Sequence, residues 1–142
     1  MKLTTKGRYA VMAMVELSLK SSKDNPIALS KISESLNIKL NYLEQIFFKL
    51  KKSNLVHASK GPGGGYFLID IPSNITIISI IEAVDRSVNI TGCSNKTASC
   101  VGIQKKCMTH HLWAGLGNII NDYLTLMTLA KVTENYFKRL ET

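Results

Sequence analysis

The chain has 142 residues, enough for one domain with a substantial core, and its hydrophobic content of 45% is typical of a globular rather than a disordered protein. It has no apolar run of about 18 residues and no signal-peptide pattern, which argues against a membrane span and against export. Three cysteines are an odd number, so we expect reduced thiols and a cytoplasmic protein without membrane contacts.

The net charge of +8 is concentrated at the N-terminal end. Residues 1–60 hold 11 Lys and Arg but only 4 Asp and Glu, and the remaining residues are close to neutral. This asymmetry indicates a polyanionic partner, most simply nucleic acid. A basic face that is only solvated is the alternative.

The first predicted element is a buried helix over 8–19. Its apolar residues recur at helical spacing: Ala10, Ala13, Met14 and Leu17. A loop follows, and Pro26 leads into a short extended piece.

A helix-turn-helix is predicted next, with a short helix over 27–36, a stop at Asn37 and a second helix over 40–52. The first helix is expected to turn these residues inward: Leu29, Ile32 and Leu36. The second should bury one face and expose the other. Its predicted buried face is Leu43, Ile46, Phe47 and Leu50, and its predicted exposed face is Asn41, Glu44, Gln45, Phe48 and Lys52. Amide and lysine side chains can read base edges or contact phosphates, although a purely structural helix pair would look similar.

A β-hairpin is predicted directly after these helices. The segments LVHASK and YFLID flank GPGGG at 61–65, and Val56 and Ala58 alternate against Tyr66 and Leu68. A hairpin in this place is a wing, with Lys60 at its base. A nucleotide-binding loop is excluded, because no Gly-Lys-Ser/Thr follows the glycines and a strand, not a helix, comes next.

Pro72 and Ser73 mark a predicted boundary between two domains, 1–72 and 73–142. The segment after it forms a helix with Thr76 as candidate N-cap. Its apolar stripe is Ile77, Ile80, Ile81 and Val84, and we expect it to pack on the preceding core.

The segment 93–110 is too polar to form part of the core, so we expect its cysteines to act as ligands or reactive thiols rather than as packing residues. Cys93, Cys100 and Cys107 are separated by gaps of six residues, and His110 follows after two more. This set suits zinc or an iron–sulfur cluster, and a thiol or nitric-oxide sensor is also open. No motif for a nucleophile, paired acids or a nucleotide loop supports an enzyme.

A long helix is expected from His110 onward. An apolar seam on it consists of Leu116, Ile120, Tyr123 and Met127. A second copy of the chain is the expected partner, and folding back on the N-terminal domain is the alternative. A further helical run follows, either capped by Thr128 or continuous with the first. The predicted fold is therefore mainly α with a small β-hairpin wing: a winged helix-turn-helix domain plus a long C-terminal dimerisation helix.

The chain also resembles the IscR family of iron–sulfur cluster regulators. The shared text comprises LTTKGRYAV, NYLEQIF, GPGGGY, IEAVD and the MTH-x-LW after the last cysteine, in order along residues 1–130. Both cysteine gaps are one residue longer than is usual in that family. Lys60 stands where arginine is common, and Phe48 where a small polar residue is common.

The resemblance implies a homodimeric repressor of cluster-assembly genes that binds promoter operator DNA. It implies a 2Fe-2S cluster on Cys93, Cys100, Cys107 and His110, received from the cluster-assembly machinery. It also implies that Glu44 discourages one class of DNA sites until the cluster is bound. A zinc-stabilised regulator, or a metal-stabilised protein-interaction module, remains the alternative. The predicted DNA-binding residues are Asn41, Tyr42, Glu44, Gln45, Lys52, Lys60, Gly61 and Gly63.

Overall fold

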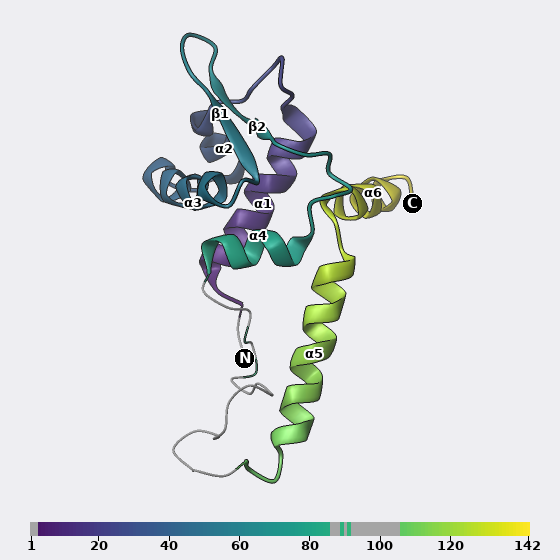
Figure 1. Ribbon diagram of the computed structural model, residues 1–142. Coiled ribbons are helices and arrows are strands. Elements are labelled where there is room, and N and C mark those ends of the chain that lie inside the picture. The colour runs from purple at the N-terminus through teal and green to yellow at the C-terminus, as the bar shows by residue number, and fades with distance from the viewer. Residues whose placement is uncertain (1–2, 86–88, 90, 92–105) are drawn as a thin grey trace.

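The computed structural model describes residues 3–85, 89, 91 and 106–142. Its helices are α1 (Thr5–Lys20), α2 (Leu29–Leu36), α3 (Leu40–Lys52), α4 (Ile77–Val84), α5 (His110–Leu126) and α6 (Leu129–Leu140). One antiparallel hairpin, β1 (Val56–Ser59) and β2 (Gly65–Leu68), lies between α3 and α4. The first four helices and the hairpin form one body, and α5 extends away from it (Figure 1). The expected mainly α fold with a hairpin wing is confirmed.

Helix α1 runs through the centre of this body. Its buried side consists of Gly7, Ala10, Ala13, Met14 and Leu17, as its spacing predicts. The helix begins three residues before the predicted start, because the Thr4 hydroxyl accepts a hydrogen bond from the Gly7 amide at 3.0 Å and caps the first turn.

Helices α2 and α3 form the predicted helix-turn-helix. Asn37 ends α2 in the left-handed conformation, with φ of 53°. Helix α3 has the predicted bounds and buries the four predicted residues: Leu43, Ile46, Phe47 and Leu50. Helix α2 begins at Leu29 rather than Ile27, because the backbone of Ile27 pairs with Tyr66 of the hairpin, at 2.8 and 3.0 Å.

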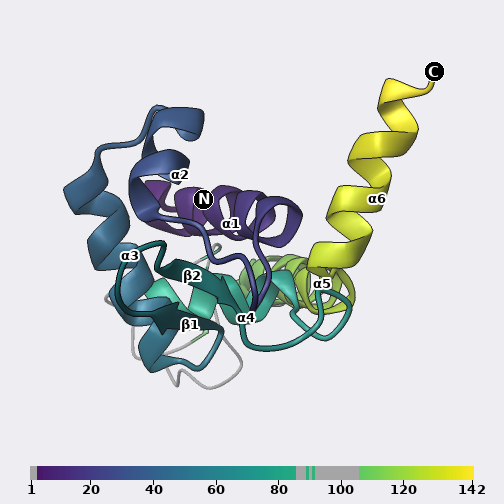
Figure 2. The ribbon, with the colours of Figure 1, turned by 90° about the horizontal axis from the view of Figure 1, so that it is seen from above.

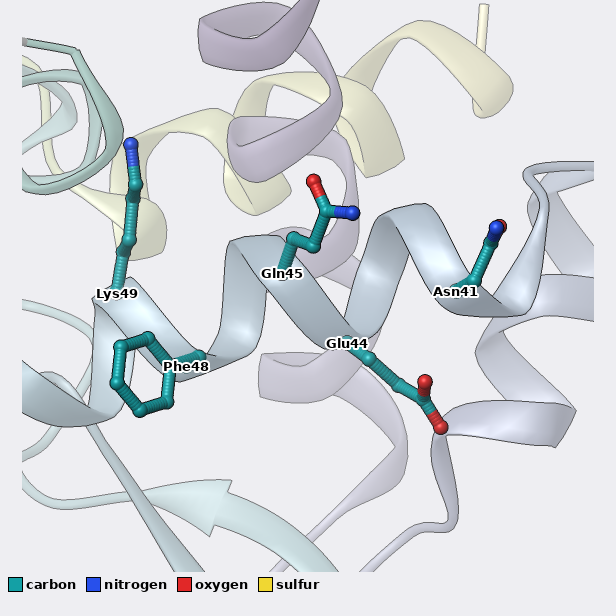
Figure 3. Close-up of a pocket in the computed structure, with 5 residues that line it drawn as sticks. All are labelled: Asn41, Glu44, Gln45, Phe48 and Lys49. Carbon is teal, nitrogen blue, oxygen red and sulfur yellow. The ribbon is translucent and has the colours of Figure 1, made fainter.

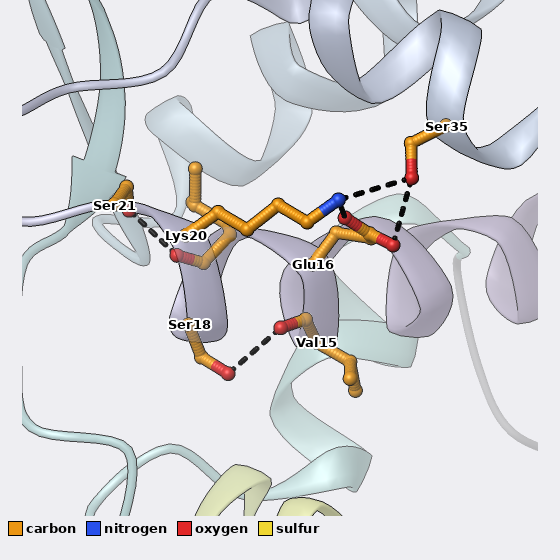
Figure 4. A network of polar contacts seen from close by, with 7 residues as sticks. Val15, Glu16, Ser18, Lys20, Ser21 and Ser35 are labelled. Atoms are coloured by element: carbon orange, nitrogen blue, oxygen red, sulfur yellow. Dashed lines mark hydrogen bonds and ion pairs between the residues drawn. The ribbon is translucent and has the colours of Figure 1, made fainter.

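Polar contacts hold α2 against α1 (Figure 4). Lys20 Nζ lies 2.6 Å from Glu16 Oε2 and donates to Ser35 Oγ at 3.1 Å. The Ser35 hydroxyl in turn donates to Glu16 Oε1 at 3.0 Å. Three side chains from two helices thus fix the position of the first helix of the pair.

The hairpin has the predicted register, in which Val56 faces Leu68 and Ala58 faces Tyr66. Its second strand starts at Gly65, where a Cβ would lie 2.3 Å from the backbone of Ile27. Only glycine permits this close approach, which joins the hairpin to the segment before α2.

Helix α4 packs on α1 and is capped by the Thr76 hydroxyl, which accepts from the Ser79 amide. Its predicted stripe is buried and belongs to the same hydrophobic cluster as the core of the helix-turn-helix. That cluster also includes Ile75 and Leu129. Buried residues on both sides of residue 72 thus belong to one hydrophobic cluster. The division of the chain at this residue stays a prediction.

Helix α6 is a separate helix and does not continue α5. The Thr128 hydroxyl caps it by accepting from the Lys131 amide at 3.2 Å. Backbone bonds from Ile77 to Met127 and from Leu129 to Ile75 anchor the junction of α5 and α6 to the start of α4. Helix α6 lies on the side of the body away from α3 (Figure 2).

Of the four residues in the seam predicted on α5, Tyr123 is exposed. The other three, Leu116, Ile120 and Met127, are partly buried, and Met127 packs against the core. The exposed apolar side chains are Leu112, Ile119, Tyr123 and Leu126, at 61–67% exposure. Leu124 near the end of α5 and Met127 just after it pack against the core, so the exposed stripe of α5 differs from the predicted one. In the described part of the chain, no helix has both the length and the hydropathy needed to cross a bilayer.

Candidate nucleic-acid interface and metal-binding segment

The outer face of α3 carries four of the eight predicted DNA-binding residues. Asn41, Glu44, Gln45 and Lys52 are all exposed. Together with Phe48 and Lys49, the first three line an open hollow of about 510 Å³ (Figure 3). The opposite face of the helix is buried in the core, and this packing orients the helix so that these side chains point toward solvent. A rigid helix with amide, carboxylate and ammonium groups on its free face can read base edges in a major groove.

The wing presents backbone and positive charge. Lys60, Gly61 and Gly63 are exposed, and the Gly64 amide donates to the Gly61 carbonyl at 2.9 Å across the turn. Gly61 and Gly63 have φ of 94° and 72°, a conformation that glycine adopts without strain. A Cβ on either would meet no atom within 4 Å, so the glycines serve the turn conformation rather than a close packing contact.

Tyr42 differs from the other predicted DNA-binding residues in its position. It is half-buried, and its ring packs edge-on against Tyr9 of α1 at 5.8 Å between ring centroids. The structure therefore places Tyr42 at the border between the free face of α3 and the core.

Lys49 has a role that the sequence pattern did not indicate. Its ammonium group donates to the carbonyl of Val84 at 3.1 Å, at the C-terminal end of α4. Next to this carbonyl, Asp85 accepts a hydrogen bond from the hydroxyl of Thr4, the N-cap of α1. Helix α4 is the last described helix before the cysteine segment at 93–110, and these contacts join its C-terminal end to both α1 and α3. Separations of 35 and 81 residues left no local signal from which to find them.

Two of the four predicted metal ligands are among the described residues, and two are not. Cys93 and Cys100 lie outside them, whereas Cys107 and His110 lie within. The His110 amide donates to the Cys107 carbonyl at 3.1 Å, so these two residues share the turn that opens α5. Cys107 is half-buried, and the His110 side chain is only 1% exposed.

The chemistry of this turn suits a metal. Cys107 Sγ lies 3.6 Å from the hydroxyl of Thr109, which also accepts from the Trp113 indole at 3.2 Å. A thiol and a buried imidazole one turn apart provide ligand types that both iron and zinc accept. Within the described ranges no three candidate ligands lie together.

Comparisons with known proteins place the chain among transcriptional regulators. The model of the Rrf2 family, described as iron-dependent transcriptional regulators, matches residues 3–135. The HTH-type transcriptional regulator IscR of Yersinia pseudotuberculosis is 46% identical over 135 residues, covering 95% of this chain and 80% of that protein. Among solved structures, CymR, the global cysteine regulator of B. subtilis, matches with a TM-score of 0.79 at 27% identity, covering 95% of this chain and 98% of that one. The IscR of T. potens matches with a TM-score of 0.76 at 27% identity, covering 96% and 88%.

Proposed function

Because this chain belongs to the Rrf2 family of iron-dependent transcriptional regulators, we propose that it is a cytoplasmic repressor of iron–sulfur cluster assembly genes that senses cluster supply. The observation that carries the proposal is the free polar face of α3 beside a basic wing, in a chain 46% identical to an IscR regulator. Transcriptional regulation is the function of these relatives, and none of them is named as an enzyme.

DNA binding follows from the positions of the two exposed elements. Helix α3 enters the major groove of promoter DNA, where Asn41 and Gln45 read adenine edges and Glu44 accepts from cytosine. Lys52 contacts phosphate at the end of the helix. The wing lies along the neighbouring backbone, with Lys60 supplying charge and Gly61 and Gly63 allowing close approach.

A 2Fe-2S cluster is the proposed cofactor, held by Cys93, Cys100, Cys107 and His110 and supplied by the cluster-assembly machinery. A bound cluster supplies a redox-active and labile iron centre, so its occupancy reports iron and oxidant status. The half-buried Cys107 and the buried His110 in one turn support the assignment. One imidazole in place of a thiolate makes such a ligand set easier to empty than four thiolates.

A homodimer formed through α5 completes the proposal. Leu112, Leu116, Ile119, Tyr123 and Leu126 follow one another at alternating spacings of four and three. This is the heptad pattern of a helix that pairs with another helix. Four of the five are at least 61% exposed in the single chain, so a second copy is the partner that this stripe fits. Two copies then present two α3 helices to a twofold-symmetric operator.

Purification without oxygen tests the cofactor and the function together. We expect a coloured protein with iron and acid-labile sulfide in equal amounts, and footprints on a promoter fragment that change when the cluster is removed. Cys107→Ala should abolish the colour and retain the dimer, whereas Met108→Ala, a change of a fully exposed neighbour, should retain both. A colourless protein with stoichiometric zinc would refute the cluster while leaving DNA binding intact.

A further inference from the structure

Phe48 is the most exposed phenylalanine, tyrosine or tryptophan in the described part of the chain, at 69%. Its neighbour Phe47 is fully buried and packs edge-on against Tyr66 at 4.9 Å. Because consecutive residues of a helix point about 100° apart, the burial of Phe47 fixes the backbone so that Phe48 faces outward. The exposure of Phe48 is thus imposed by the packing of the helix, and the ring stabilises no part of the core.

The ring of Phe48 lies within the polar face that the helix offers to DNA. Glu44 and Phe48 extend from one edge of this face, and Gln45 and Lys49 from the other (Figure 3). All four line the same open hollow. Three lysines lie within the four residues that follow Phe48: Lys49, Lys51 and Lys52. The positive charge of this end of the helix favours an anionic partner over the apolar surface of another protein.

The major groove offers one apolar group that such a ring can contact, the C5-methyl of thymine. Amide and carboxylate groups recognise hydrogen-bonding edges but gain nothing from a methyl group. A phenyl ring has the opposite preference, because it gains only by removing apolar surface from water. Phe48 lies one turn beyond Glu44 and Gln45, about 5 Å along the helix axis, which corresponds to one or two base pairs along the groove.

We propose that Phe48 is a specificity-determining residue that contacts the C5-methyl of a thymine, one or two base pairs from the pair read by Gln45. The inference rests on the proposed DNA-binding function and adds to it a preference for thymine over cytosine at that position.

Uracil substitution tests this contact without changing the protein. Binding sites are first selected with the unmodified protein from a random DNA duplex, and each thymine of the selected site is then replaced singly by deoxyuridine. This replacement removes the methyl group and keeps every hydrogen-bonding group. We expect one position in each half-site where uracil weakens binding about fourfold, the effect of losing one buried methyl contact.

The variant Phe48→Ser provides the second arm of the experiment. It should bind the thymine and uracil sites equally, while Phe48→Leu retains part of the difference. Leu19→Ser, which removes an exposed apolar side chain from α1, should leave the fourfold difference unchanged. Equal thermal unfolding of the variants confirms that their fold is intact.

Each outcome distinguishes this inference from the proposed function. Specific binding that no uracil substitution weakens would overturn the methyl contact and leave the regulator intact. A uracil effect of the same size in Phe48→Ser would show that another residue reads the methyl. Failure to select any DNA sequence would overturn the proposed function together with this inference.

Discussion

Lys49 Nζ lies 3.1 Å from the carbonyl oxygen of Val84, which joins the recognition helix to the last turn of α4. The ammonium group satisfies a carbonyl at a helix C-terminus, where positive charge is favourable. Val84 is the last residue of α4, which is the last described helix before the segment 93–110 that holds the predicted cluster ligands. A displacement of this end of α4 would therefore reach α3 through one side chain.

Replacing Lys49 by methionine should lower the free energy of unfolding by about 1 kcal/mol, the contribution of one such hydrogen bond. Lys51→Met, at an exposed position of the same helix, should change it by less than about 0.5 kcal/mol. Urea unfolding at one fixed protein concentration measures both. Equal losses in the two variants would mean that the contact with Val84 contributes nothing.

The N-terminal cap of α1 should contribute to the stability of the fold. Thr4→Val removes the acceptor for the Gly7 amide and the bond to Asp85, so we expect a loss of about 1 kcal/mol in the free energy of unfolding. Thr5→Val, at the next position and also exposed, should have a much smaller effect. Thermal unfolding distinguishes them, and a similar loss for both would count against the cap.

The wing lysine should contribute to DNA affinity through charge. Lys60→Ala should weaken binding to all DNA sequences and reduce the slope of log affinity against log salt by about 1. Lys138→Ala removes an exposed lysine of α6 that pairs with Glu134 at 2.7 Å, and it should leave the slope unchanged. Titrations at several salt concentrations decide the matter, and an unchanged slope for Lys60→Ala would exclude a phosphate contact.

A charge on the free stripe of α5 should separate the two copies of the chain. Ile119→Glu places a carboxylate at a position that is 67% exposed in the single chain and central to the proposed interface. Asn118→Glu, an exposed neighbour on a different side of the helix, is the matched control. Sedimentation should give monomers for the first variant and dimers for the second. Dimers in both would place the interface elsewhere.

The fold was largely predictable because its signals are local. The buried face of α3, the stop at Asn37 and the cap at Thr76 all depend on residues within one or two turns of each other. The register of the hairpin follows in the same way from alternation on two strands that a short turn connects. The free seam of α5 was predicted only in part, because several stripes of that helix are apolar and their sorting depends on which one packs on the body.

The candidate site likewise has features that could be predicted from local sequence and features that could not. The free face of α3 could be predicted residue by residue, but the half-buried position of Tyr42 against Tyr9 depends on how two helices meet. Cys107 and His110 could be selected as candidate metal ligands from residue type and spacing, while the burial of the imidazole could not be predicted.

The amino-acid sequence by itself determined the order of the elements, the inward and outward faces of α3, and which residues of the cysteine segment are candidate ligands. Each of these follows from periodicity or side-chain chemistry over a short stretch of chain. The tertiary structure alone decided that Lys49 and Thr4 meet the end of α4, and that α5 turns Leu112 and Ile119 outward. These depend on which distant residues become neighbours when the helices pack, and no local pattern encodes that.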